Sequence, residues 1–181
     1  GTFTGYATLC LAEGLHPEGE IHTIDVNEEL EDFQRKYFDK SGYGTQIHQH
    51  LGSAIDILPT LDKTFDLVFI DADKDNYVNY FNLIIDTMNP GGIILSDNVL
   101  WSGKVIETLN PKDKMTKAVL EYNTLLKEDK RVWLAFFWTM LTMGSATAII
   151  FIGIVLLKFI NIKRFVPIAV LFVVLISHSQ F

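Results

Sequence analysis

Acidic and amide side chains stand where two apolar stretches of the sequence end. Asp71 directly follows Phe65–Ile70, and Asp97 and Asn98 close the stretch Gly91–Asn98. Mostly apolar runs such as Leu67–Ile70, which show no period-2 alternation, are typical of strands covered on both faces of a parallel sheet. Ligands bind beyond the carboxyl ends of such strands, so three oxygen donors are expected to meet there. Oxygen donors without Cys or a nearby His suit Mg²⁺, which would bind a substrate hydroxyl and favour its ionised form.

A lysine close to these donors is a candidate general base. Lys74 lies three residues after Asp71, within reach of the proton of a metal-bound hydroxyl. A solvated lysine that pairs with Asp73 or Asp75 would produce the same spacing. For the three oxygen donors, the alternative explanation is ordinary helix capping.

A glycine-bearing turn at Gly1–Gly5 and a later acid predict a nucleoside site. The glycines let the backbone approach a ligand closely, and Asp25 ends the next strand 20 residues after Gly5. At this spacing an acid can accept both hydroxyls of a ribose. The turn does not match G-x-G-x-x-G, so a ribose-bearing ligand without a diphosphate is favoured. The alternative is that the glycines serve only the turn and that Asp25 caps the following helix.

Strands and helices alternate in the pattern of residues 1–132. This order predicts βαβ units and an α/β domain with a doubly wound sheet. The predicted strands are Glu20–Val26, Gln46–Gly52, Phe65–Ile70 and Gly91–Asn98, and the predicted helices are Tyr6–Glu13, Glu28–Ser41, Ala54–Leu61, Asn76–Met88 and Lys112–Lys127.

The charge distribution separates this part of the chain from the rest. All 22 acidic residues and 12 of the 15 basic ones lie before Trp133. A net negative head without a basic cluster does not suit nucleic acid, because binding phosphates needs grouped Lys and Arg. The single cysteine, Cys10, forms no intrachain disulfide and fits a reducing compartment.

The tail follows a different pattern. Trp133–Leu157 has 25 residues without a charge, which is long enough to cross a bilayer as a helix. Phe165–Ile176 is a second apolar run of 12 residues, short for a full span. The tail is therefore expected to contain C-terminal apolar helices, at least one of them transmembrane, with a buried core helix as the alternative.

Five separated motifs resemble one enzyme family. In order they read GTFTGYATL, IDV, GSA, FIDADKDNY and PGGIILSDNVLWSG. Together they are similar to the cation-dependent O-methyltransferases of the caffeoyl-CoA and catechol type, which use S-adenosylmethionine. The resemblance covers residues 1 to about 132 and implies a partial Rossmann-like class I methyltransferase domain.

The resemblance implies a role for each matched residue. It places Asp71, Asp97 and Asn98 on the metal ligands and Lys74 on the lysine proposed as base in the catechol branch. Trp101 follows the metal pair and is expected to line the acceptor pocket, where a catechol-like or other small phenolic acceptor would bind. The residues that fall on cofactor-contacting positions are Gly1, Thr2, Ala7, Asp25, Ala54 and Asp73.

Departures from the family predict two domains of different origin, a methyltransferase part at 1–132 and a hydrophobic tail at 133–181. Family members have covering helices and a central strand before the position of Gly1 and a closing strand pair after that of Val132. Without them, this polypeptide alone is expected to fold poorly and to methylate nothing. A truncated record or a reading-frame change explains both ends more simply than a membrane fusion. The catalytic part is expected in the cytoplasm, anchored to a membrane if the tail is genuine.

Two other functions and one further site remain open. A metal-dependent glycosyltransferase would also use Asp71-Ala-Asp73 after an apolar strand, and an inactive membrane-tethered fragment would need no chemistry. His48 and His50 share one face of a strand at a spacing that can bind metal, but no third ligand is apparent, so an exposed face is favoured. A homodimer is expected from the resemblance alone.

Overall fold

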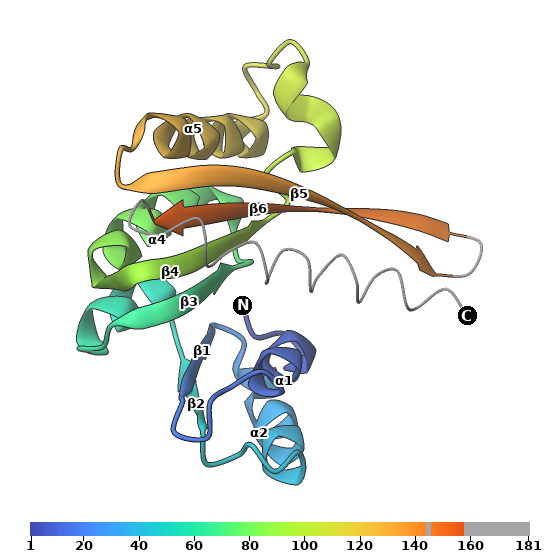
Figure 1. The fold of residues 1–181 in the computed structure, drawn as a ribbon. Coiled ribbons are helices and arrows are strands. Elements are labelled where there is room, and N and C mark those ends of the chain that lie inside the picture. Colours follow the sequence, from blue (N-terminus) through green and yellow to red (C-terminus); the bar gives the residue numbers. More distant parts are fainter. Residues whose placement is uncertain (144–145, 158–181) are drawn as a thin grey trace. The chain divides into compact units, whose positions relative to one another are not determined.

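The computed structural model describes residues 1–143 and 146–157 of the chain. It divides into two compact units (Figure 1). The first contains Gly1–Lys63 and Asp71–Asp86, and the second contains Thr64–Ile70 and the chain from Thr87 onward. The residues predicted from the sequence to form one active site are therefore distributed over both units.

A short parallel sheet and the helices around it form the first unit. Side chains alternate along a strand, and the alternation that begins at Ile21 and Ile47 turns these residues toward helices α1 and α2. Ala12, Phe38 and Ile47 form the buried cluster of this unit, and Ile21 packs against it. Burying Phe38 completely contributes about 1.5–3 kcal/mol. The elements are α1 (Tyr6–Ala12), β1 (Ile21–Asp25), α2 (Glu31–Lys40), β2 (Ile47–Leu51), α3 (Ala54–Ile57), η3 (Lys74–Asn76) and α4 (Tyr77–Ile84).

Helix α4 presents an apolar stripe at helical spacing. Tyr77, Tyr80, Phe81 and Ile84 are all buried, and residues three and four positions apart lie on one face of a helix. The two tyrosines also make polar contacts that matter for the site. This helix follows directly on the acidic turn that ends at η3, so its packing determines how that turn is held.

The second unit is a four-stranded sheet in the order β3-β4-β6-β5. β3 runs parallel to β4, with Ile70 beside Ser96, whereas β6 runs antiparallel to both β4 and β5. The register of β3 on β4 shifts between Phe65 and Leu67, opposite the Pro-Gly-Gly stretch that begins at Pro90. The strands are β3 (Phe65–Ile70), β4 (Met88–Asp97), β5 (Val132–Met143) and β6 (Ala146–Leu157), and the helices are η5 (Trp101–Ile106) and α5 (Lys114–Glu128).

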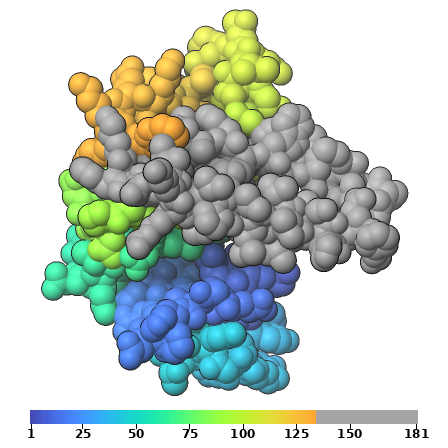
Figure 2. Space-filling view, in the orientation of Figure 1, coloured from blue at the N-terminus to red at the C-terminus, as the bar shows by residue number. Residues whose placement is uncertain are grey.

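Helix α5 begins at a side-chain cap and is amphipathic. The carboxylate of Asp113 accepts hydrogen bonds from the backbone N–H and the hydroxyl of Thr116, at 3.0 and 2.8 Å. A cap of this kind stabilises a helix by about 1 kcal/mol. Val119, Tyr122 and Leu126 form its buried face. The segment η5 lies beside the start of α5 in both Figure 1 and Figure 2. Lys104 of this segment lies 3.4 Å from Asp113.

The expected alternation of strands and helices is present in residues 1–132, but the predicted transmembrane helix at Trp133–Leu157 is wrong. These residues form β5 and β6, two antiparallel strands of 12 residues. The same strands rule out the buried core helix that was the alternative. They also show that the expectation of no strand pair after Val132 is wrong. No helix in the described part of the chain is long and apolar enough to cross a bilayer. Phe165–Ile176 lies outside the described residues.

Candidate active site

The glycine-bearing turn folds over the carboxylate of Asp25. Asp25 Oδ2 accepts a hydrogen bond from the backbone N–H of Phe3 at 2.7 Å, and a Cβ added at Gly1 would lie 3.2 Å from the same oxygen. Gly5 has a φ of 82°, and a Cβ there would lie only 2.6 Å from the ring of Phe38. Glycine is therefore required at this point of the turn.

Asp25 is held as an anion by backbone donors. Its second oxygen, Oδ1, accepts the N–H of Asn27 at 2.9 Å. Burial raises the pKa of Asp25, but the N–H groups of Asn27 and Phe3 more than offset this effect, so the pKa lies below its ordinary value. The helix-capping alternative does not describe Asp25, because the side chain of Asn27, not that of Asp25, caps the following turn by accepting the N–H of Glu29 at 3.0 Å.

Buried hydroxyl groups tie the turn to the sheet. The hydroxyl of Thr2 lies 2.7 Å from that of Thr23 on β1, and Thr8 on α1 lies 3.3 Å from the same hydroxyl. Thr2 and Thr8 are each 6% exposed. Because buried hydroxyls need partners, these bonds set how α1 and its preceding turn sit on β1.

The two predicted alanines begin helices at the same end of this small sheet. Ala7 is the second residue of α1 and is exposed, and Ala54 is the first residue of α3 and half-buried. The turn before Ala54 is anchored because the N–H of Gly52 donates to the carbonyl oxygen of Asp25 at 2.8 Å. The first unit thus brings the glycine turn, Asp25 and the start of α3 together at the carboxyl ends of β1 and β2.

Lys74 is buried and lies beside Asp71. It is 7% exposed, its Nζ lies 3.4 Å from Asp71 Oδ1, and it donates a hydrogen bond to the hydroxyl of Tyr77. The alternative of a solvated lysine that pairs with Asp73 or Asp75 is therefore wrong. A buried polar group needs such partners, and Asp71 and Tyr77 supply them.

Asp73 is held by two side chains of the following helical segment. Its Oδ1 accepts the hydroxyl of Tyr80 and its Oδ2 accepts the amide of Asn76, each at 2.5 Å. Burial raises the pKa of Asp73, but these two hydrogen bonds outweigh it and leave the pKa below its ordinary value. Burial and the bond to Asp73 in turn raise the pKa of Tyr80. No pattern in the sequence identified Tyr80 as more than a packing residue.

In the second unit, Asp97 and Asn98 mark the end of β4. Asn98 has a φ of 55°, which Asn tolerates better than most residues because its side chain bonds locally. Two contacts from α5 hold this turn. The hydroxyl of Tyr122 lies 2.6 Å from that of Ser96, and the amide of Asn123 donates to the carbonyl oxygen of Val99 at 2.7 Å.

Trp101 follows in a strained loop. It has a φ of 44°, and Ser102 after it has a φ of 55°, a region that costs non-glycine residues about 1 kcal/mol or more. The N–H of Trp101 donates to the carbonyl oxygen of Asn98 at 2.9 Å. Its indole N–H is buried and has no hydrogen-bond partner among the described residues.

The three predicted metal ligands follow paired strand ends. Ile70 of β3 lies beside Ser96 of β4 in the parallel register. The next residues along the chain are Asp71 and Asp97, with Asn98 after the latter. Asp71 belongs to the first unit, and Asp97 and Asn98 belong to the second.

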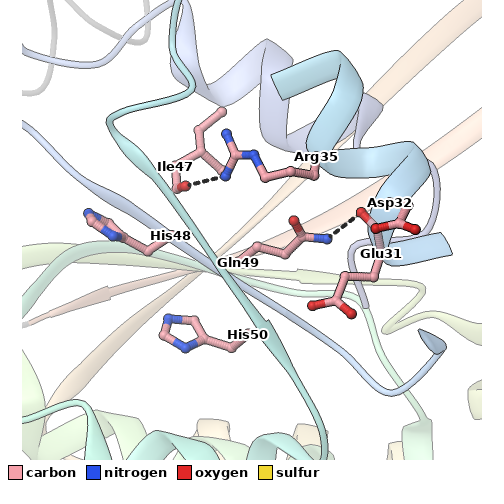
Figure 3. Close-up of a pocket in the computed structure, with 7 residues that line it drawn as sticks. All are labelled: Glu31, Asp32, Arg35, Ile47, His48, Gln49 and His50. Atoms are coloured by element: carbon pink, nitrogen blue, oxygen red, sulfur yellow. Dashed lines mark hydrogen bonds between the residues drawn. The ribbon is translucent and has the colours of Figure 1, made fainter. Parts of the chain in front are cut away.

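A pocket in the first unit lies elsewhere, along the outer edge of β2 (Figure 3). Its lining contains none of the residues predicted for the active site. Figure 3 shows its polar contacts, in which Arg35 donates to the carbonyl oxygen of Ile47 at 3.1 Å and Gln49 to that of Glu31 at 3.0 Å. The residues that line it are Glu31, Asp32, Arg35, Ile47, His48, Gln49 and His50.

Comparison with known families gives a match over most of the chain. A family model described as O-methyltransferase matches residues 1–152, a range that extends past the boundary expected near Val132. A caffeoyl-CoA O-methyltransferase of Petroselinum crispum is 36% identical over 143 residues, which cover 73% of this chain and 59% of the relative. Caffeoyl-CoA O-methyltransferase 5 of Nicotiana tabacum is 37% identical over 145 residues, with 73% and 60% covered. The chain thus spans about three-fifths of the length of these relatives.

Solved structures give the same result for the fold. The O-methyltransferase TomG from Streptomyces achromogenes, involved in tomaymycin synthesis and in complex with SAM, superposes with a TM-score of 0.78 at 30% identity. The match covers 87% of this chain and 70% of that one. An O-methyltransferase from Bacillus cereus in complex with SAH superposes with a TM-score of 0.76 at 30% identity, covering 86% and 71%. The chain has the α/β Rossmann-like fold of these neighbours.

Proposed function

The chain belongs to the O-methyltransferase family, and from this premise we propose that it transfers the methyl group of S-adenosylmethionine to a hydroxyl of a small phenolic acceptor. The acceptor class is a catechol-like phenol, including the caffeoyl thioesters named for its relatives. The observation that carries the proposal is the arrangement around Asp25, where the turn that begins at Gly1 folds over a carboxylate fixed by backbone donors.

The first unit supplies the proposed cofactor site. A carboxylate has about four lone-pair positions. The N–H groups of Phe3 and Asn27 occupy two of those on Asp25, and the N–H of Thr2 also lowers its pKa. The positions that these donors leave suit the hydroxyls of a ribose. Around this acid, Gly1, Thr2 and Ala7 are proposed to contact the methionine part, Ala54 the adenine, and Asp73 a further part of the cofactor. The SAM and SAH complexes of structural neighbours support this ligand.

The proposed cation site consists of Asp71, Asp97 and Asn98. All three offer oxygen atoms, which are the donors that Mg²⁺ prefers, and the pairing of Ile70 with Ser96 supports placing Asp71 and Asp97 at neighbouring strand ends. A divalent cation bound there would supply charge that holds two adjacent acceptor oxygens and favours the ionised hydroxyl.

Lys74 is proposed to move the proton. Nζ of Lys74 would take up the proton of the acceptor hydroxyl, and S-adenosylmethionine, when bound, would supply the methyl group that the hydroxyl oxygen receives. Tyr77 and Asp71 keep Nζ in one position, and burial keeps water away from it. Trp101, whose indole N–H has no partner among the described residues, is proposed to donate to an oxygen of the acceptor.

A glycosyltransferase that uses Asp71-Ala-Asp73 is not favoured. The family match covers residues 1–152, and a nucleotide sugar has no use for the separate pair Asp97 and Asn98. The two functions differ in their donor, so calorimetry with S-adenosylmethionine and with a nucleotide sugar separates them.

A methyl-transfer assay tests the proposal. The chain, alone and joined to the N-terminal segment of a caffeoyl-CoA O-methyltransferase, would be incubated with labelled S-adenosylmethionine and either catechol or caffeoyl-CoA. Methylation should require Mg²⁺ and should be lost in EDTA and in Asp71→Ala. The joined form is the one expected to be active, since the sequence predicts that the chain alone methylates nothing. Transfer that survives both EDTA and Asp71→Ala would rule out the cation mechanism, and absence of S-adenosylmethionine binding in both forms would rule out the function.

A further inference from the structure

A grid of metal-binding side chains lies on one face of the β1–β2 sheet. His22 of β1 lies beside His48 of β2 in the parallel register, and His50 follows two residues later on the same face. Glu20, two residues before His22, continues the row just before the start of β1. Parallel neighbours are about 4.8 Å apart and side chains two residues apart share a face, so the register alone brings these four side chains together.

This face points away from helix α2. The intervening residue Gln49 donates to the carbonyl oxygen of Glu31 and to the side chain of Gln34, so it occupies the α2 side of β2. Figure 3 shows His48 and His50 on the opposite side of the strand from Gln49. The side chain of His48 is 41% exposed and that of His22 is 14% exposed, which leaves an open path for an ion.

Three of the side chains already have ligand spacing. One ligand atom from each of Glu20, His22 and His48 lies within 4.8 Å of the others. His22 Nε2 lies 3.4 Å from Glu20 Oε2, and His48 Nε2 lies 3.9 Å from Glu20 Oε1. Ligands at 2.0–2.1 Å from a tetrahedral Zn²⁺ are about 3.3 Å apart. The His22–Glu20 separation comes close to this value, whereas the His48–Glu20 separation is longer and runs to the other carboxylate oxygen. The exposed side chains of Glu20 and His48 must therefore turn for one ion to be held.

We propose that Glu20, His22 and His48 form a peripheral site for a transition-metal dication such as Zn²⁺, with His50 as the residue that orients His22. Imidazole and carboxylate donors suit Zn²⁺, Ni²⁺ and Cu²⁺, whereas Mg²⁺ prefers oxygen alone. This site is therefore chemically distinct from the proposed Mg²⁺ site. Three protein ligands leave a fourth position for water or a further donor.

His50 and Lys63 complete the arrangement. His22 Nδ1 lies 3.0 Å from His50 Nε2, so when Nε2 of His22 binds a metal its Nδ1–H can donate to His50. Metal-bound histidines almost always make such a second contact, which fixes the ring. Lys63 lies 2.7 Å from Glu20 Oε2, the oxygen that also faces His22, so an ion held through Oε2 must displace Lys63, whereas Oε1 lies on the side of His48.

A bound ion would join the start of β1 to β2. Glu20 and His22 come from one strand and its approach, and His48 comes from the other, so one ion links segments 26 residues apart in the sequence. Binding that favours the folded state raises its stability. Because Asp25 and Leu51 end the same two strands, the metal would stabilise the sheet that carries the proposed cofactor site.

Zinc binding by the EDTA-treated, dialysed chain, alone and joined to the N-terminal segment used in the methyl-transfer assay, tests this site. Calorimetry should detect one Zn²⁺ per chain in the presence of excess Mg²⁺, and Co²⁺ in its place should give the visible absorption of a site with nitrogen ligands. His50→Ala should weaken binding about 10- to 100-fold, and His22→Ala and His48→Ala should weaken it further. His16→Ala removes a histidine outside the cluster and should change nothing.

The outcomes separate this site from the proposed enzyme function. Each histidine variant should bind S-adenosylmethionine like the unchanged chain, so loss of zinc binding alone supports the site whether or not methyl transfer is found. Zinc binding that persists in the double variant His22→Ala/His48→Ala, or that His16→Ala reduces equally, would overturn it. So would displacement of Zn²⁺ by millimolar-range Mg²⁺, since oxygen-preferring Mg²⁺ competes poorly for imidazole.

Discussion

Replacing Asp25 with asparagine separates its two roles. The side chain keeps its size and one carbonyl oxygen, but an NH₂ group replaces the second oxygen and the charge is lost. In the structure both carboxylate oxygens accept backbone N–H groups, that of Phe3 at 2.7 Å and that of Asn27 at 2.9 Å. The new NH₂ group must therefore face one N–H donor, and only one oxygen remains for the ribose.

The expected magnitude follows from these lost bonds. A hydrogen bond to a charged group contributes about 1.5–3 kcal/mol. Loss of one ribose bond should weaken S-adenosylmethionine binding roughly 10- to 150-fold, at about 1.4 kcal/mol for each factor of ten. Loss of one backbone bond should lower the free energy of unfolding by a similar amount, because Asp25 holds the Gly1–Gly5 turn even without a ligand.

Calorimetry with S-adenosylmethionine and urea unfolding measure the two effects on the same variant. Asp62→Asn is the matched control, because Asp62 is exposed and has a φ of 44°, which asparagine adopts readily. If Asp25→Asn binds S-adenosylmethionine as tightly as Asp62→Asn does, Asp25 does not bind the ribose. If Asp25→Asn lowers the free energy of unfolding but not the affinity for S-adenosylmethionine, Asp25 has only a structural role.

Other parts of the chain give three further expectations. Lys74→Met should lower kcat of the active form about 10²- to 10⁴-fold while the Kd for S-adenosylmethionine stays the same; an equal rise in Kd would make Lys74 a binding residue. Tyr122→Phe leaves the buried Ser96 hydroxyl without its bond and should cost about 1–3 kcal/mol at neutral pH. Burial raises the pKa of Tyr122 to about 12. The folded state favours the neutral phenol, and this contribution to the free energy of unfolding is full below about pH 10. It is lost as the pH rises through 12, a loss of about 2–3 kcal/mol. Alkaline unfolding curves of Tyr122→Phe should not show this loss. Ile154→Pro removes an N–H from β6, which is paired on both sides, and should cost about 1–3 kcal/mol in urea unfolding relative to Ile154→Val; equal stability of the two variants would contradict the strand.

Much of the fold follows from local patterns in residues 1–132. The alternating stretch Glu20–Val26 contains β1, and the mostly apolar run Phe65–Ile70 coincides with β3. The expected cover on both faces of β3 is wrong, because Leu67 and Phe69 are 43% and 38% exposed. Side-chain periodicity carries this information because burial on one or both faces of a strand leaves a direct signature. The stretch Gly91–Asn98 began too late, since β4 starts at Met88. There Pro90 and the two glycines after it suggested a turn, whereas the chain continues through an irregular pairing.

Part of the candidate active site could also be predicted from the sequence, for a different reason. Acids at strand ends are visible in one sequence, so Asp25 and Asp71 could be found together with their neighbour Lys74. The groups that hold them could not, because the N–H of Phe3 belongs to the backbone and leaves no mark in residue types. Tyr80 looked like part of a helix stripe, and only the structure shows that its hydroxyl binds Asp73.

The histidine grid shows the same dependence on pairing. His48 and His50 share one face of a strand, but the other two proposed ligands, Glu20 and His22, lie just before and on a different strand. His22 precedes His48 by 26 residues, and the two meet only because β1 pairs with β2 in this register. A shift of the register by one residue would turn His22 toward the opposite face from His48. Metal binding at this face is therefore also a test of the register.

The tail shows where hydropathy alone misleads. A 25-residue stretch without charge can satisfy its backbone as one helix in a bilayer, or as two strands in a sheet. In a sheet, each of the two strands needs only about half of the 25 residues. β5 ends at Met143 and β6 begins at Ala146, with the pair Gly144-Ser145 between them in the sequence. Gly and Ser between two β-branched and aromatic runs favour a hairpin. Pairing of β6 with β4 then uses the N–H and C=O groups that β4 would otherwise leave open beside Asp97, so the hairpin completes the sheet from which the proposed metal ligands extend.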